Sequence, residues 1–150
     1  MEELQIPIIS FYSGDYITDT DGRLLKVLEN SKRNETILTN YGNVTNHILI
    51  PLTKDILLSC GFCLNQTKSR YEVTIDDIIV SITVDSNFIV DDIQIYGIQY
   101  SIADHPCSQR GWCILSDLQD AVRDLCGKEL PINEERLKNE IQKQIHCGKL

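Results

Sequence analysis

Two cysteines separated by two residues, Cys60 and Cys63, form the most reactive pattern in the sequence. A Cys-x-x-Cys pair that opens a helix is redox-active, because the helix N-terminus lowers the pKa of the first thiol. Here the apolar residues before Cys60 place the pair at the end of a helix, where backbone carbonyl groups disfavour a thiolate. We therefore expect Gly61 to cap this helix, Phe62 to enter the core, and the pair to have no redox role.

One loop contains three potential zinc ligands: His105, Cys107 and Cys113. Thiolate and imidazole groups suit zinc, and a cysteine of the preceding pair could complete a tetrahedral site. Structural zinc sites usually supply their ligands as two close pairs, and this loop does not have that spacing. The sequence favours buried thiols without a metal, and zinc binding by this loop is the alternative.

Two pairs of adjacent aspartates, residues 76–77 and 91–92, could serve as acid-base groups or cation ligands. Adjacent residues on a strand point to opposite faces, so the carboxylates of one pair do not converge. Both pairs flank expected strands, where aspartate is a common turn residue. The sequence also contains no glycine-rich phosphate loop, nucleophile elbow or helical His-Glu-x-x-His motif. We predict no catalytic residue, no metal and no cofactor, and hence no enzyme.

Arg110 and Trp112 are candidates for contact with a partner. Both residue types are enriched at binding hot spots, and here they are separated only by Gly111 in a loop. A lone tryptophan is more often found in a protein core than at an interface, so burial of Trp112 is the competing interpretation.

The first fifty residues are expected to form a small β-barrel. Short apolar runs between residues 14 and 50 are separated by turn residues. Asp21 and Gly22 lie between two such runs, and Asp-Gly predicts a tight hairpin because the turn requires positive φ. Four or five strands in this order predict an SH3-like barrel over residues 1–50.

Residues 51–130 are expected to form a lobe with a helix, a sheet and a second helix. Thr53 is a good N-cap for the first helix, residues 54–60. Alternating apolar residues then predict an antiparallel sheet with three strands, at residues 71–75, 78–84 and 93–102.

The second helix of this lobe has the clearest pattern. Ser116 and Gln119 have the spacing of a capping box, and Gly127 suits the end of the helix. Between them, four apolar residues recur on one face: Leu118, Ala121, Val122 and Leu125. Together these elements predict the α+β class, with an N-terminal barrel packed on the helix–sheet–helix lobe.

Residues 131–150 are expected to add a C-terminal amphipathic helix. Leu137, Ile141 and Ile145 recur at four-residue spacing on a polar background. Such a narrow stripe suits a helix laid in a groove or a coiled-coil seam. We expect these three residues to mediate self-association or partner binding, and the upstream lobe to fold without them.

Composition and charge limit the classes of partner. The net charge is −8, from 22 acidic and 14 basic residues, which disfavours binding to nucleic acid. The N-terminus has no basic segment typical of a signal peptide, and no segment reaches the roughly 18 apolar residues that span a membrane. We expect the cytoplasm as the location and six free or buried cysteines.

Several segments resemble small uncharacterised proteins encoded by phages and integrated mobile elements of gut Bacteroidetes. These segments are residues 50–58 with 60–62, residues 118–120 with 125–130, and residues 14–17, 21–23 and 26–27. The resemblance covers most of residues 14–130 and consists of structural motifs. It implies a phage or mobile-element origin, in the bacterial cytoplasm or in a virion, and implies no activity.

These observations favour a non-enzymatic, phage-encoded binding module. It would be an accessory factor that engages a host protein or a nucleotide signal, or a minor virion component. The alternative is an enzyme whose carboxylate or thiol site does not match a known motif.

Overall fold

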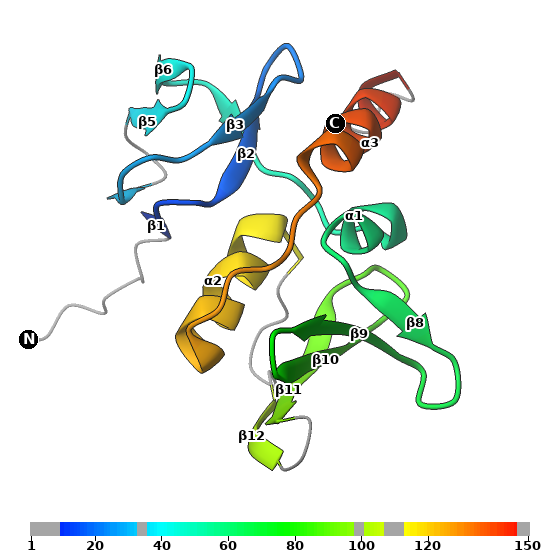
Figure 1. Ribbon diagram of the computed structural model, residues 1–150. Helices are drawn as coiled ribbons and strands as arrows, with labels where there is room; N and C mark the ends of the chain where they lie inside the picture. The colour runs from blue at the N-terminus through cyan, green and yellow to red at the C-terminus, as the bar shows by residue number, and fades with distance from the viewer. Residues whose placement is uncertain (1–9, 33–35, 98–100, 107–112, 147–150) are drawn as a thin grey trace, which may run out of the picture.

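The computed structural model describes residues 10–32, 36–97, 101–106 and 113–146, with the backbone alone at residue 10 and at residues 101–106. Three helices and twelve strands in this part of the chain confirm the α+β class. Figure 1 shows the first seven strands and the last five on opposite sides of the helices. Among the described residues, no helix is both long and apolar enough to cross a membrane.

The first seven strands form three small antiparallel sheets, which we call the N-terminal β unit (residues 10–48). The sheets have the orders β1-β4, β3-β2-β7 and β5-β6. Their bounds are β1 Ser10–Phe11, β2 Tyr16–Asp19, β3 Leu24–Lys26, β4 Ser31–Lys32, β5 Ile37–Thr39, β6 Gly42–Val44 and β7 His47–Ile48. The described residues form no closed barrel, so the expected SH3-like barrel is not observed. An isolated bridge between Val27 and Thr39 connects the sheet of β3 to that of β5 at one point.

The predicted Asp-Gly hairpin is confirmed and connects β2 to β3. Gly22 has a φ of +83°, and its N–H donates to Asp19 O at 3.1 Å. Asp19 Oδ1 also accepts the N–H groups of Asp21 and Arg23, both at 2.9 Å. The hairpin tip contacts the C-terminal helix so closely that a Cβ on Gly22 would lie 1.9 Å from Ile145 Cδ1.

Substitution of Gly22 by alanine should therefore destabilise the protein by about 2–3 kcal/mol, because a strained left-handed backbone is combined with a steric clash. Gly42→Ala is a matched control: Gly42 has a φ of +96° and no atom within 4 Å of its Cβ position. The control should show backbone strain alone, about 1–2 kcal/mol. Urea unfolding measures both values, and equal losses would contradict the predicted cost of the clash with the end of the Ile145 side chain.

The first helix, α1 (Lys54–Ser59), has the caps that the sequence predicts. Thr53 Oγ1 accepts the N–H of Ile56 at 3.1 Å. At the other end, Gly61 has a φ of +90°, and its N–H donates to Leu58 O at 3.1 Å. The N–H of Phe62 donates to Leu57 O at 3.1 Å, which completes a Schellman motif.

The sheet after α1 has five strands in the order β12-β11-β10-β9-β8, where the sequence predicted three. Its bounds are β8 Cys63–Asn65, β9 Arg70–Ile75, β10 Ile78–Val84, β11 Val90–Gly97 and β12 Ser101–Pro106. All neighbouring strands are antiparallel, as predicted. The third expected strand is divided into β11 and β12, and the short β8 lacks the alternation that would predict it.

The second helix, α2 (Leu115–Cys126), ends as predicted at Gly127, which has a left-handed backbone. The capping box at its start is wrong, because Ile114 is the N-cap and makes no side-chain cap bond. Ile114 forms a β-bridge with Pro51, and the N–H of Leu115 donates to Ile50 O at 2.8 Å. These backbone bonds fix the helix start one residue before Ser116.

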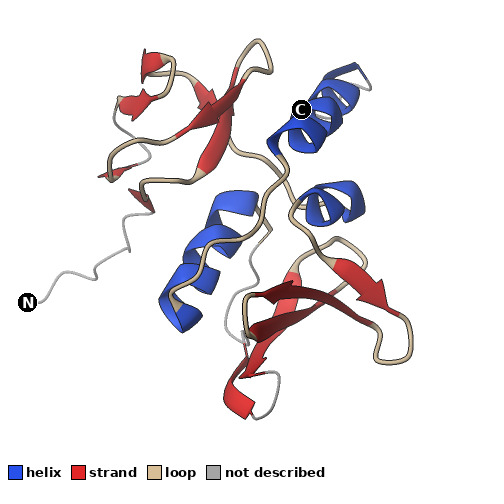
Figure 2. Cartoon of the chain, in the orientation of Figure 1, coloured by secondary structure: helices blue, strands red, loops and turns tan. Residues whose placement is uncertain are grey.

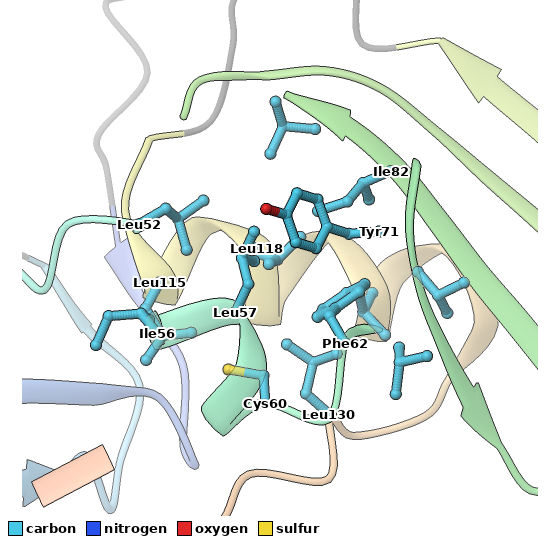
Figure 3. Close-up of a cluster of buried hydrophobic side chains, with 14 of the residues drawn as sticks. Leu52, Ile56, Leu57, Cys60, Phe62, Tyr71, Ile82, Leu115, Leu118 and Leu130 are labelled. Atoms are coloured by element: carbon cyan, nitrogen blue, oxygen red, sulfur yellow. The ribbon is translucent and has the colours of Figure 1, made fainter. Parts of the chain in front are cut away.

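Figure 3 shows the main core, where α1 and α2 contribute side chains that face the inner side of the sheet. Ile56, Leu118 and Ile82 are fully buried there. Five residues of the N-terminal β unit form a second, smaller core: Phe11, Ile17, Leu25, Val27 and Ile37. Tyr16 and Leu24 belong to the main core instead, so the β unit and the rest of the chain share buried surface.

The C-terminal helix, α3 (Glu134–His146), contacts α1 and β3 (Figure 2). Leu137 and Ile141 are fully buried members of the main core, and Ile145 is partly buried against it. The N–H of Asn133, just before the helix, donates to Ser59 O at 2.8 Å. The structure thus differs from the expectation that this helix is an addition outside a complete lobe, because the apolar stripe is covered by the chain's own elements.

Candidate functional site

A groove of about 590 Å³ lies between the N-terminal β unit and the segment that runs from α2 to α3. We call it the inter-unit groove. The β unit supplies Ser13, Gly14, Tyr16, Lys26, Val27 and Leu28, and the other wall consists of Gln119, Glu129, Leu130, Pro131, Ile132 and Glu134. The groove therefore depends on how the β unit is held against α2 and α3.

Gln119 of α2 holds the β unit in place at the groove. Its side chain is almost completely buried. Gln119 Oε1 accepts the N–H of Tyr16 at 2.9 Å, and Gln119 Nε2 donates to Gly14 O at 3.0 Å. Both polar atoms of the amide are thus used to fix the backbone at the start of β2.

Tyr16 joins the β unit to α3 within the groove. Its hydroxyl group donates a short hydrogen bond to Glu134 Oε2. Burial, together with the nearby Glu134 carboxylate, raises the pKa of the Tyr16 phenol well above its usual value. Tyr16 is therefore a neutral hydrogen-bond donor and is not an acid-base group at physiological pH.

Next to the groove, one guanidinium contacts three carboxyl groups. Arg123 Nη1 lies 2.9 Å from Asp15 Oδ1 and 2.8 Å from Asp120 Oδ1, and Arg123 Nε lies 2.6 Å from Glu129 Oε2. We call these four residues the carboxyl–guanidinium cluster. Asp15 comes from the β unit and its side chain is fully buried, whereas the other three residues lie on α2 or just after it.

Burial perturbs both aspartates of this cluster. It raises the pKa of Asp120 to about 8, with a further contribution from the neighbouring Asp15. Burial also raises the pKa of Asp15, although hydrogen bonds from Asp120, Tyr12 and Arg123 oppose the change. A carboxylic acid that keeps its proton near neutral pH is the kind of group that acid catalysis requires.

The position of these aspartates argues against catalysis. Asp15 has no exposed side-chain surface, and Asp120 is not among the described residues that line the inter-unit groove. A general acid must reach the substrate within hydrogen-bond distance. Of the cluster, Glu129 lines the groove, whereas the two aspartates do not and instead join two parts of the fold.

The two cysteines of the Cys-x-x-Cys pattern lie in different environments. Cys60 caps the C-terminal end of α1 and is fully buried, and burial raises the pKa of its thiol to about 12. Cys63 is exposed at the start of β8. Both thiols are free. Cys60 is thus a core residue, as the helix-end interpretation of the sequence predicts.

Most of the other predicted site residues are not among the residues that the structure describes. Arg110, Trp112 and Cys107 lie outside the described residues, as does the side chain of His105, and Cys113 is exposed. The described residues contain no group of three potential metal ligands. The residues proposed for partner contact on α3 instead contact the protein's own core: Leu137, Ile141 and Ile145.

Of the adjacent aspartates, residues 76–77 connect β9 to β10, whereas residues 91–92 lie within β11 and do not flank it, and one aspartate of each pair forms an ion pair. Asp76 Oδ2 lies 3.1 Å from Lys128 Nζ. Asp92 Oδ1 lies 2.9 Å from Arg70 Nη2 on the outer face of the sheet and accepts a hydrogen bond from Thr83 at 2.8 Å. These two aspartates thus pair with different cations, Lys128 and Arg70.

Sequence reasoning missed the carboxyl–guanidinium cluster. Asp15 and Arg123 are 108 residues apart, so no local motif connects them. The available signal was Asp15 itself, which is a charged residue between Gly14 and the apolar start of a strand. Comparison with protein-family models, with curated proteins and with solved structures finds no match for this chain.

Proposed function

We propose that this protein is a non-enzymatic binding module that receives a protein segment in the inter-unit groove. The observation that supports this is the groove itself, which is formed by three separate parts of the chain and combines polar with apolar lining residues. Specific binding sites commonly have this mixed character. We further propose, from the resemblance described above, that the module is a phage accessory factor in the bacterial cytoplasm or a minor virion component.

The state of the polar groups favours binding over catalysis. Both polar atoms of the Gln119 side-chain amide form hydrogen bonds with backbone groups. The Tyr16 hydroxyl group donates to Glu134, and Cys60 is a buried neutral thiol. The aspartates with raised pKa values are not among the residues that line the groove. The described lining thus supplies no activated nucleophile and no acid-base pair for a bound substrate.

Charge favours a protein segment over a nucleotide signal. The groove is lined by one lysine, Lys26, and by two glutamates, Glu129 and Glu134. A phosphorylated ligand requires an excess of positive charge, whereas this lining has an excess of negative charge. Leu28 is 48% exposed in the same lining and offers an apolar contact to a partner side chain.

A photo-crosslinking amino acid at position 28 tests this proposal. In the cells that produce the protein, Leu28 replaced by p-benzoylphenylalanine should crosslink to one defined protein, either a partner or a second copy. Leu64 is a matched control, because it is 42% exposed and lies outside the groove. Mass spectrometry identifies the crosslinked proteins. Crosslinks formed from position 28 and not from position 64 support the proposal. Equal products at both positions, or none at position 28, contradict it.

A further inference from the structure

We infer that the Asp15–Asp120 carboxyl pair, bridged by Arg123, is a proton-operated latch that fastens the N-terminal β unit to α2. The latch is closed while the pair holds one proton and is weakened when both carboxyl groups are ionised. This inference does not depend on what the inter-unit groove binds.

Two aspartate side chains contact the same nitrogen atom of Arg123. Asp15 Oδ1 and Asp120 Oδ1 lie 2.9 and 2.8 Å from the same atom, Arg123 Nη1. The two carboxyl groups are therefore close neighbours. Asp15 is the residue before β2, and its other oxygen, Oδ2, accepts the N–H of Tyr12 at 3.0 Å. The contact thus joins the backbone of the β unit directly to a helix of the main core.

The charges around the pair do not balance when all groups are ionised. Among the described residues, Arg123 is the single cation in direct contact, whereas Asp15, Asp120 and Glu129 each add a negative charge. Asp117, one turn before Asp120 on the same helix, adds a further repulsive effect on Asp120. Two ionised carboxylates this close and this buried repel each other, and binding one proton removes the repulsion.

The direction of the pKa changes agrees with this geometry. The pKa of Asp120 is raised to about 8 and that of Asp15 is raised above 3.8, whereas both should titrate near 3.8 in a detached chain. The folded state therefore binds the proton more tightly than the detached state does. The proton's contribution to stability is fully present below about pH 4, falls as the pH rises, and is lost once the pH passes about 8.

The Tyr16 amide is a direct reporter of the latch. Its N–H donates to Gln119 Oε1, so this bond crosses the same junction one residue away from Asp15. Hydrogen exchange at this amide requires its bond to Gln119 to open, and separation of the β unit from α2 opens that bond. The protection factor, corrected for the intrinsic pH dependence of exchange, therefore measures the latch.

The experiment is amide hydrogen exchange by NMR between pH 5 and pH 9. In the unaltered protein, protection at Tyr16 should fall by up to about tenfold per pH unit up to pH 8 and then level off. Asp120→Asn keeps the shape of the neutral acid and should remove this pH dependence. Asp124→Asn is the control, because Asp124 is exposed on the same helix, and it should behave like the unaltered protein.

Two results would overturn the inference. One is protection at Tyr16 that does not change with pH, or that falls equally in Asp120→Asn. The other is a direct ¹³C titration of the unaltered protein in which both Asp15 and Asp120 lose their protons below pH 5. Because the titration needs no variant, the inference is still tested if Asp120→Asn does not fold.

Discussion

Deletion of residues 132–150 is expected to abolish the cooperative thermal transition of this protein. The deletion removes α3, whose Leu137 and Ile141 are fully buried in the main core. Burial of each such side chain contributes about 1.5–3 kcal/mol, and typical domains are stable by only about 5–15 kcal/mol. The Tyr16–Glu134 hydrogen bond and the contact of Gln142 with Gly22 are lost as well.

Point variants on α3 show whether the loss of stability comes from its buried side chains or from shortening the chain. Leu137→Ala should destabilise the protein by about 2–5 kcal/mol. Lys138→Ala, at the next and exposed position, should have little effect on the melting temperature. If the truncated protein melts like the full chain, α3 is dispensable for the core, and the sequence-based expectation of a partner-binding helix is restored.

Arg123→Gln is expected to destabilise the protein by about 3–5 kcal/mol at pH 7. The substitution removes the cation next to Asp15, which has no exposed side-chain surface, and a buried charge without its partner is strongly unfavourable. Protonation of the aspartates relieves part of this penalty, so the loss should be smaller at pH 5. Urea unfolding at both pH values measures the effect.

A second substitution and a surface control make this result specific. Asp15→Asn in the Arg123→Gln background should recover part of the lost stability, because the buried charge is removed together with its partner. Lys128→Gln breaks the ion pair with Asp76 and should change stability little, because both side chains are solvent-exposed. Equal effects of Arg123→Gln and Lys128→Gln would show that the cluster behaves as an ordinary surface ion pair.

Local signals in the sequence predicted the local structure well. The hairpin at Asp21 and Gly22, the N-cap at Thr53 and the helix ends at Gly61 and Gly127 all occur as expected. Each depends on the backbone preferences of one or two residues, which act over a single turn. The alternation of apolar residues likewise located β9 and β10 with nearly correct bounds.

Features that depend on distant parts of the chain were not predictable. The pattern of Leu137 and Ile141 shows that α3 has an apolar face, but periodicity does not specify whether another protein or α1 covers that face. Ser116 has capping-box spacing, yet a β-bridge between Ile114 and Pro51 sets the helix start. Asp15 and Arg123 have ordinary sequence neighbours, and only the fold brings them together.

The contact of the hairpin with α3 also constrains how the protein folds during its synthesis. Gln142 Nε2 donates to Gly22 O at 3.2 Å, across 120 residues of sequence. At about 5–20 residues per second, a ribosome needs about 6–24 s to make the chain between them. Until α3 is made, the apolar surface that it will cover stays open on the nascent protein. Premature release or slow translation near the 3′ end of the message should therefore produce aggregation-prone chains that engage chaperones.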